Sequence, residues 1–371
     1  MLINVFIFLI KVARKLRIGK FAFRILNSCF HEQVSLDKDA LERAQNLLNK
    51  ISPDPNNSCI LPNANQIQQA YDLQVIIPAY NAEAYIERCV DSVLCQQTSY
   101  KVLVTVINDG STDNTTSILK KYESDDRVEV ITQENRGFSG ARNRGLNNLK
   151  AKYISFLDSD DEWMGDVNQL LQAAYETDAD IIEGSYVVFN ETGDLQTVSH
   201  DDLVAEKGGS LLYGFPWGKL IKSELFQRIC FPELYWFEDT VMAFIIYPLC
   251  QKVVTSSILF YRYRMNPLGI SATSVQKPKV VDSYWITERL LKDRAIIGLE
   301  NGEFIETMLG QVRMNYNRIR SLKRTDVDRA VFILTAHLWN NYFATYQCDA
   351  PLAKALNERD YLMYKLVLEL C

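Results

Sequence analysis

The chain has 371 residues, enough to bury a large core and to form about two domains. Apolar residues make up 47% and charged residues 23%, which are globular proportions and exclude a disordered or collagen-like chain. The net charge of −6 argues against a general nucleic-acid-binding protein, which would normally be basic. With only 3 histidines and 8 cysteines that form no Cys-x-x-Cys pair, a zinc site is not expected. Scattered cysteines of this kind fit free thiols in a reducing compartment.

Residues 1–30 form a basic and apolar N-terminal segment. Leu2–Ile10 is almost entirely apolar, and basic residues interleaved with apolar ones follow it, with no acid before Glu32. An apolar run of this length is too short to span a bilayer, for which a helix needs about 20 residues. The apolar run precedes the basic one, whereas a secretory signal has the reverse order. This pattern favours a helix lying on an anionic membrane surface, and the alternative is a helix packed on the protein itself.

Residues 31–70 are predicted to contain a helix and a linker. Ser35–Ile51 has apolar residues at helical spacing, with Ser35 as a plausible N-cap. The stretch 52–70 is rich in Pro, Asn and Gln, which is typical of a linker.

Strands and helices are predicted to alternate in the region 71–275, and this order indicates βαβ units and a mostly parallel sheet flanked by helices. The predicted strands are Gln74–Pro78, Val102–Ile107, Val128–Thr132, 153–157, Asp180–Phe189 and Val253–Arg264. The predicted helices are Ala84–Cys95, Asn114–Tyr122, Ser139–Leu149, Val167–Tyr175 and Glu238–Cys250. Residues 276–371 show only helical patterns, roughly 282–296, 303–322, 326–345 and 351–370, and are predicted to form a helical C-terminal module.

The stretch Phe156–Asp161 places three aspartates directly after a predicted buried strand. Open α/β sheets bind ligands beyond the carboxyl ends of their strands, where these carboxylates would lie. Asp158 and Asp160 are two positions apart, so on an extended segment their side chains point the same way. Oxygen ligands so placed suit Mg²⁺ or Mn²⁺. The alternative is an acidic surface turn, in which Asp and Ser are common.

Three other predicted strands are also followed by polar clusters. The first is Val75–Asn81, where Pro78 ends the strand, and the second is Asn108–Asp113. The third is Asn135–Gly145, whose arginines are suited to bind phosphate at the start of a helix. Each cluster alone is compatible with a turn or a helix cap, but four at one edge of one sheet indicate a binding site.

In this order and spacing, the clusters resemble those of family 2 nucleotide-diphospho-sugar glycosyltransferases, of the bacterial polysaccharide or lipooligosaccharide type. The matching pieces span about 75–161 and read Val-Ile-Ile-Pro-Ala-Tyr-Asn, Asn-Asp-Gly-Ser-Thr-Asp, Asn-Arg-Gly-x-x-x-Ala-Arg-Asn-x-Gly and Phe-Leu-Asp-Ser-Asp-Asp. Weaker matches extend the resemblance to about residue 275. The resemblance implies a GT-A fold, which is α/β with a Rossmann-like, mixed and mostly parallel sheet, for the region 71–275.

The resemblance also implies roles for individual residues. Asp158 and Asp160 would be the Asp-x-Asp pair that binds Mn²⁺ or Mg²⁺, and Asp239 would be the catalytic base. The family usually has two aspartates where this chain has Asn108 and Asp109, so recognition of the base is expected to differ in detail. The donor nucleotide would lie against Pro78, Ala79, Tyr80, Asn81, Glu83, Asn108, Asp109, Arg142, Asn143, Asp158 and Ser159. Asp161, Trp217, Lys219 and Glu238 would contact the donor sugar or the acceptor, and Arg262 and Arg264 the diphosphate.

The chemistry of glycosyl transfer agrees with these roles. The leaving diphosphate gains negative charge, which a divalent cation offsets, and the acceptor hydroxyl must lose its proton to a base. A single displacement inverts the anomeric configuration. The sequence therefore predicts an inverting, metal-dependent hexosyl- or N-acetylhexosaminyltransferase that moves a sugar from a UDP-sugar to a hydroxyl of a glycan or lipid-linked acceptor. Its expected place is cell-surface polysaccharide synthesis, in the cytoplasm and peripheral on the inner face of the membrane.

Two other interpretations are open. A sugar-nucleotide nucleotidyltransferase would need a glycine-rich loop with Lys or Arg directly after the first strand, where this chain has Pro78–Asn81. A non-catalytic sugar-nucleotide-binding module would not need the Asp158 and Asp160 pair together with Glu238 and Asp239.

Overall fold

The computed structural model describes residues 6, 9, 10, 12, 13, 15, 18–267 and 269–370. The chain divides into two compact units, of which one is Pro55–Thr273 and the other combines Met1–Asp54 with Ser274–Cys371. The first part of the expected N-terminal segment 1–30, up to residue 17, lies largely outside the described residues. The described N-terminal helices belong to the same unit as the C-terminal helices, so the chain leaves this unit and later returns to it.

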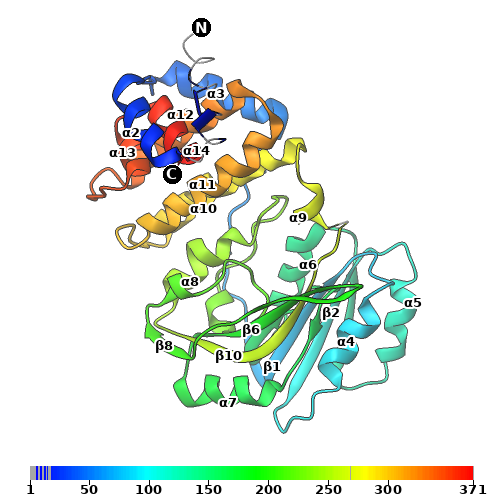
Figure 1. Ribbon diagram of the computed structural model, residues 1–371. Helices are drawn as coiled ribbons and strands as arrows, with labels where there is room; N and C mark the ends of the chain where they lie inside the picture. The colour runs from blue at the N-terminus through cyan, green and yellow to red at the C-terminus, as the bar shows by residue number, and fades with distance from the viewer. Residues whose placement is uncertain are drawn as a thin grey trace. The chain divides into compact units, whose positions relative to one another are not determined.

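The unit of residues 55–273 is built on a sheet that Figure 1 shows with helices on both faces. The described strands form one 10-stranded sheet in the order β3-β2-β1-β4-β9-β6-β10-β5, with β7 beside β6 and β8 beside β10. Their bounds are β1 (Ile67–Ala79), β2 (Val102–Asp109), β3 (Val128–Gln133), β4 (Leu149–Phe156), β5 (Glu162–Trp163), β6 (Ile181–Asn190), β7 (Gly193–Val198), β8 (Leu203–Glu206), β9 (Lys219–Lys222) and β10 (Lys252–Arg264). Neighbours among β1 to β4 pair in parallel, as do β6 and β10, whereas β9 is antiparallel to β4 and to β6.

Strand β1 shows why helices cover both faces of this sheet. Leu73, Val75 and Ile77 alternate along the strand and are fully buried in the core that also holds residues of α4, α5 and α7. Ile76 points to the other face, where α6 packs so closely that a Cβ on Gly145 would lie 2.5 Å from Ile76 Cγ2. The helices of this unit are α4 (Ile86–Leu94), α5 (Thr115–Leu119), α6 (Gly137–Leu146), α7 (Val167–Thr177), α8 (Tyr247–Leu249) and α9 (Ile270–Thr273), with a π-helical turn at Met242–Ile246.

The second unit is helical. Its helices are α2 (Gly19–Cys29), α3 (Lys38–Ile51), α10 (Asp282–Ile296), α11 (Ile305–Ile319), α12 (Thr325–Tyr342), α13 (Pro351–Asn357) and α14 (Tyr361–Leu370). The buried carboxylate of Asp360 accepts hydrogen bonds from the backbone N–H groups of Leu362, Met363 and Glu32, at 3.0–3.1 Å. Asp360 therefore caps α14 and ties it to the N-terminal part of the chain. None of the helices in the described parts of the chain has both the length and the hydrophobicity needed to cross a bilayer.

The predicted α/β region with a mostly parallel sheet is confirmed, and the differences are local. The helix predicted at 351–370 is two helices, because Arg359 takes a positive φ of 57° and Asp360 starts a new helix. The helix predicted from Glu238 begins only at Met242. The helix predicted to end at Leu149 ends at Leu146, since β4 already begins at Leu149. The short strands β5, β7, β8 and β9 were not predicted.

Asp180, just before β6, joins three segments of the sheet unit. Its carboxylate accepts hydrogen bonds from the backbone N–H groups of Gln251 and Lys252, at 2.7 and 3.1 Å, and from Lys222 Nζ at 3.0 Å. Burial raises the pKa of Asp180, but Lys222 and the two amides outweigh burial and hold the pKa below its ordinary value.

We predict that Asp180→Asn lowers the free energy of unfolding by about 1–3 kcal/mol near neutral pH. A depressed carboxylate pKa stabilises the fold above the unfolded value, and this stabilisation is lost as the pH falls through the folded value. The difference in unfolding free energy between the variant and the parent protein should therefore become smaller below about pH 4. Urea unfolding at neutral and acidic pH measures it, with exposed Asp201→Asn as the control. A deficit that does not change with pH would contradict the ion-pair explanation.

Candidate active site

A cavity of about 470 Å³ opens at the edge of the sheet where β1, β2 and β4 end. Its lining comes from the ends of β1, β2 and β10 and the residues that follow β1 and β10, from the segments after β3 and β4, from α6, and from the residues before the π-helical turn. The lining residues are Pro78, Ala79, Tyr80, Asp109, Asn135, Gly137, Phe138, Ala141, Arg142, Asp158, Ser159, Asp160, Phe237, Glu238, Asp239, Tyr263, Arg264, Asn266 and Gly269. The cavity therefore brings together residues from all four of the polar clusters.

Two residues predicted at the donor nucleotide, Asn81 and Glu83, join loops instead of lining the cavity. Asn81 Oδ1 accepts a hydrogen bond from the backbone N–H of Thr112 at 2.8 Å. Glu83 Oε2 accepts one from the backbone N–H of Asn114 at 2.9 Å. Both side chains thus hold the loop after β1 against the loop after β2, which fixes the cavity wall formed by Tyr80 and Asp109.

Asn108 and Asp109 have different roles at the end of β2. Asn108 Oδ1 accepts from the backbone N–H of Ser111 at 3.1 Å, so this side chain shapes the turn. The turn needs glycine at Gly110, whose φ is +74° and where a Cβ would lie 2.9 Å from the backbone N of Asn135. Asp109 lines the cavity and accepts from Gln133 Nε2 at 2.7 Å and from the backbone N–H of Arg136 at 2.9 Å.

Asp158 and Asp160, the predicted metal pair, both line the cavity. Asp158 Oδ1 accepts a hydrogen bond from Arg142 Nη2 at 2.8 Å, and Asp160 Oδ2 accepts one from Asn266 Nδ2 at 2.9 Å. Burial raises the pKa of Asp160, and the nearby charge of Asp158 raises it further. A bound cation near Asp160 would offset this effect and favour the ionised carboxylate.

The residues fit a divalent cation whose coordination is completed from outside the protein. No group of three or more His, Cys, Asp or Glu side chains that could hold a metal ion occurs among the residues the structure describes. Mg²⁺ is commonly held by only one or two carboxylates together with substrate phosphates and water. Asp158 and Asp160 match this pattern better than that of a metal cage made wholly of protein ligands.

Asp161, predicted to touch the donor sugar or acceptor, lies below the cavity and not in its lining. Its two carboxylate oxygens accept from the Tyr261 hydroxyl at 2.7 Å and from the backbone N–H of Arg264 at 2.6 Å. The Tyr261 hydroxyl also accepts from the backbone N–H of Asp158, at 3.2 Å. Burial raises the pKa of Asp161 well above its ordinary value, and the charges of Asp158 and Asp160 add to this effect. Asp161 therefore fastens the acidic loop to β10.

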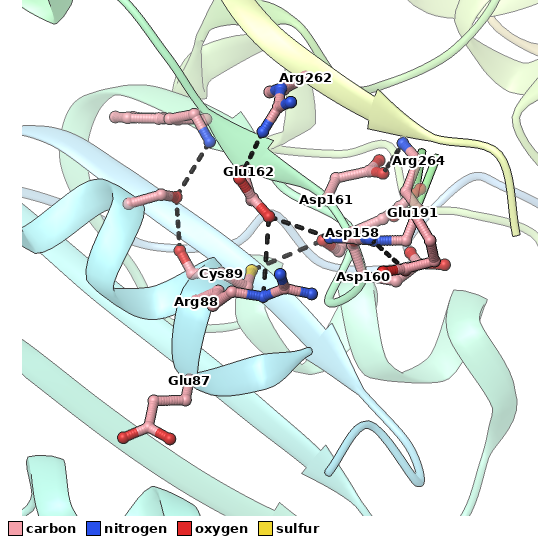
Figure 2. A network of polar contacts seen from close by, with 12 residues as sticks. Glu87, Arg88, Cys89, Asp158, Asp160, Asp161, Glu162, Glu191, Arg262 and Arg264 are labelled. Atoms are coloured by element: carbon pink, nitrogen blue, oxygen red, sulfur yellow. Dashed lines mark hydrogen bonds and ion pairs between the residues drawn. The ribbon is translucent and has the colours of Figure 1, made fainter. Parts of the chain in front are cut away.

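Arg262 and Arg264, predicted at the diphosphate, take part in an ion-pair network centred on Glu162 (Figure 2). Arg264 lines the cavity, but each of its three guanidinium nitrogens already donates a hydrogen bond: Nε to the carbonyl of Asp160, Nη1 to Glu191 and Nη2 to Glu162, at 2.7–2.9 Å. Arg262 is paired with Glu162 at 3.2 Å and with Asp194 at 2.6 Å, outside the lining.

Trp217 and Lys219, predicted at the donor sugar or acceptor, lie in the core. The Trp217 ring stacks on Phe215 and Tyr261, with centroid distances of 4.1 and 4.6 Å. The fully buried Lys219 donates from Nζ to Glu183 at 2.7 Å and to the carbonyl of Phe215 at 2.8 Å. Because lysine and glutamate neutralise each other there, this pair needs no ligand to justify its burial.

Glu238 and Asp239 line another part of the cavity. Arg142 Nη1 donates a short hydrogen bond to Glu238 Oε1, so the buried Arg142 bridges Glu238 and Asp158. Burial raises the pKa of Glu238 and the charge of Asp239 adds to this, while Arg142 acts in the opposite direction. Asn143, predicted at the nucleotide, lies outside the lining and pairs with the backbone of Phe231.

Sequence reasoning did not single out six side chains of the lining: Asn135, Phe138, Ala141, Phe237, Tyr263 and Asn266. Asn135, Phe138 and Ala141 belong to the third polar cluster, in which they were passed over because their neighbours carry charge. Asn266 had only one signal, which is its position just after a predicted strand at the same edge of the sheet.

A polar cavity with paired carboxylates at the carboxyl edge of a parallel sheet defines an α/β enzyme of the nucleotide-binding kind. Residues 74–233 match the family model described as "Glycosyl transferase family 2". Glycosyltransferase GlyG of Streptococcus pneumoniae is 30% identical over 250 residues, which cover 62% of this chain and 82% of the relative. The chain therefore belongs to glycosyl transferase family 2 and is a glycosyltransferase.

Two further proteins are similar to this chain, over different shares of their own length. Glycosyltransferase GlyA of Streptococcus pneumoniae is 35% identical over 226 residues, covering 55% of this chain but only 32% of that longer protein. The crystal structure of S. aureus TarS 1–349 in complex with UDP-GlcNAc has a TM-score of 0.61 at 19% identity, covering 80% of this chain and 90% of that one. This structural similarity confirms the expected fold.

We predict that Lys219→Met lowers the free energy of unfolding by about 3–5 kcal/mol, because it leaves the buried Glu183 carboxylate without its cation. Urea unfolding measures this loss, and addition of Glu183→Gln should restore part of it. A raised KM for donor or acceptor with unchanged stability would instead place Lys219 at the substrate.

Proposed function

We propose that the protein transfers a sugar from a UDP-sugar to a hydroxyl of a glycan or lipid-linked acceptor in cell-surface polysaccharide synthesis. The single observation that carries this proposal is the cavity that collects Tyr80 and Asp109, Asp158 and Asp160, and Glu238 and Asp239 in one space. The solved relative TarS was crystallised with UDP-GlcNAc, which supports a UDP-sugar as donor. Family membership favours this function over nucleotidyl transfer and over a non-catalytic binding module.

In the proposed complex the nucleotide lies beside Tyr80 and Asp109, and the diphosphate lies at Asp158 and Asp160. These two aspartates would hold Mn²⁺ or Mg²⁺, which when bound supplies Lewis-acid stabilisation of the diphosphate charge. Arg142 orients the Asp158 carboxylate through its 2.8 Å hydrogen bond.

Asp239 is the proposed base that accepts the proton of the acceptor hydroxyl. Both Glu238 and Asp239 line the cavity, but Glu238 forms an ion pair with the buried Arg142, so Asp239 is the proposed base. A single displacement assisted by one base inverts the anomeric centre.

We also propose that the N-terminal part of the helical unit contacts an anionic membrane from the cytoplasmic side. On α2, Ala22 and Leu26 are buried, while Ile25 is 48% exposed; Ile18, the N-cap residue seven positions earlier, is 42% exposed. The sequence from Lys11 to Arg24 contains basic residues and no acid, which complements anionic headgroups.

The function is tested by measuring UDP release from a series of UDP-sugars, with and without Mn²⁺ and acceptor glycans. Asp239→Asn should lower turnover by about 10²- to 10⁴-fold with UDP affinity retained, because it removes only the base. Exposed Asp126→Asn is the matched control and should leave turnover unchanged. Turnover without any metal dependence would refute the role of Asp158 and Asp160, and full activity of Asp239→Asn would refute the base.

The membrane proposal is tested by sedimentation of the full chain with phosphatidylglycerol vesicles and with phosphatidylcholine vesicles. We expect binding to the anionic vesicles only, and we expect Ile18→Asp combined with Ile25→Asp to weaken it several-fold because two apolar contacts are lost. Val204→Asp, at an exposed residue of β8, is the control. Equal sedimentation with both kinds of vesicle, or with neither, would contradict the proposal.

A further inference from the structure

Helix α6 is bonded at several places to the segment 231–238, which leads to the proposed base. Asn143 makes a two-way pair with the backbone of Phe231: its Nδ2 donates to the carbonyl and its Oδ1 accepts from the N–H, both at 2.8 Å. Asn143 Nδ2 also lies 3.2 Å from Glu233 Oε1. Asn143 is only 7% exposed, so its amide must find its hydrogen-bond partners within the protein.

Two arginines of the same helix region contact the same segment. Arg136, at the N-cap of α6, donates from Nη2 to both carboxylate oxygens of Glu233, at 2.8 and 3.0 Å. Arg142 donates to Glu238, and its guanidinium lies 5.4 Å from the ring centre of Phe231. The contacts therefore occur at residues 231, 233 and 238. These positions flank Leu234 and Phe237, which have positive φ angles.

The backbone between these contacts takes an unusual conformation. Leu234 and Phe237 have positive φ angles of 71° and 66°, which cost non-glycine residues of the order of 1 kcal/mol or more each. Such a conformation persists only where its surroundings enforce it, and the contacts from α6 contribute to that constraint.

We propose that Asn143 is a positioning residue for the base: with Arg136 and Arg142, it fixes the segment that carries Asp239 at a set distance from the acidic loop. This assignment replaces the nucleotide contact that the family resemblance implies for Asn143. It rests on the proposed function, since Asp239 is the base only if the protein transfers sugars. Because Arg142 also binds Asp158, one helix sets the spacing between the diphosphate site and the base.

The test is Asn143→Asp, which keeps the acceptor for the Phe231 N–H but puts a carboxylate against the Phe231 carbonyl and Glu233. We expect kcat to fall by about tenfold or more, as small misplacements of catalytic groups do, with the Kd for UDP changed by less than about twofold. Hydrogen exchange should become faster at 231–239 and stay unchanged at 156–161. The matched control is Asn147→Asp, at the exposed C-cap of the same helix, which should match the parent protein in every measurement.

A second variant keeps the proposal testable if Asn143→Asp does not fold. Arg136→Lys breaks the two-oxygen contact with Glu233 at a side chain that is 56% exposed, and it should lower kcat about two- to fivefold with UDP binding retained. The proposal is overturned if either variant weakens UDP binding as much as it lowers kcat/KM, or if exchange at 231–239 does not change. If the parent protein binds no UDP, the proposed function fails, whereas the exchange measurement still decides whether Asn143 fixes the segment.

Discussion

The buried guanidinium of Arg142 is the constraint on which the arrangement of the site depends. A cation that is only 6% exposed must be paired, and Arg142 is paired with Asp158 on the acidic loop and with Glu238 beside the proposed base. If both carboxylates moved away, the guanidinium would be left as an uncompensated buried charge, at a cost of several kcal/mol. Two loops far apart in the sequence are thereby held to one helix, and the cavity between them keeps its width.

Much of the fold and the position of the cavity could be predicted from the sequence. The alternation of strands and helices over 71–275 predicted the sheet, and polar clusters after strands predicted the edge at which ligands bind. Pro78, Asp109, Asp158 and Asp239 all line this cavity. The short strands could not be predicted in this way, because the two residues of β5 or the four of β9 are too few to show a period.

The roles of individual polar residues were harder to predict, for a physical reason. A loop that must present a few side chains to a ligand needs others to hold its backbone, and both kinds are Asp, Asn, Glu or Arg. Asn81, Glu83, Asn108 and Asp161 hold loops, and Lys219 neutralises Glu183 in the core. Nothing in sequence spacing separates these from Asp158 or Asp109, since the difference lies in which neighbours the fold brings within 3 Å.

The division of the chain into a continuous and a discontinuous unit has a consequence for synthesis on the ribosome. Residues 55–273 can fold as soon as they have emerged, whereas α3 emerges earlier and must wait for α12, the helix against which it packs. Until then its face of Ala40, Ala44 and Leu48 has no partner and is exposed to other chains. The nascent protein thus passes through a stage with a finished catalytic unit and an unfinished helical one. Chaperones would act on its first helices rather than on its sheet.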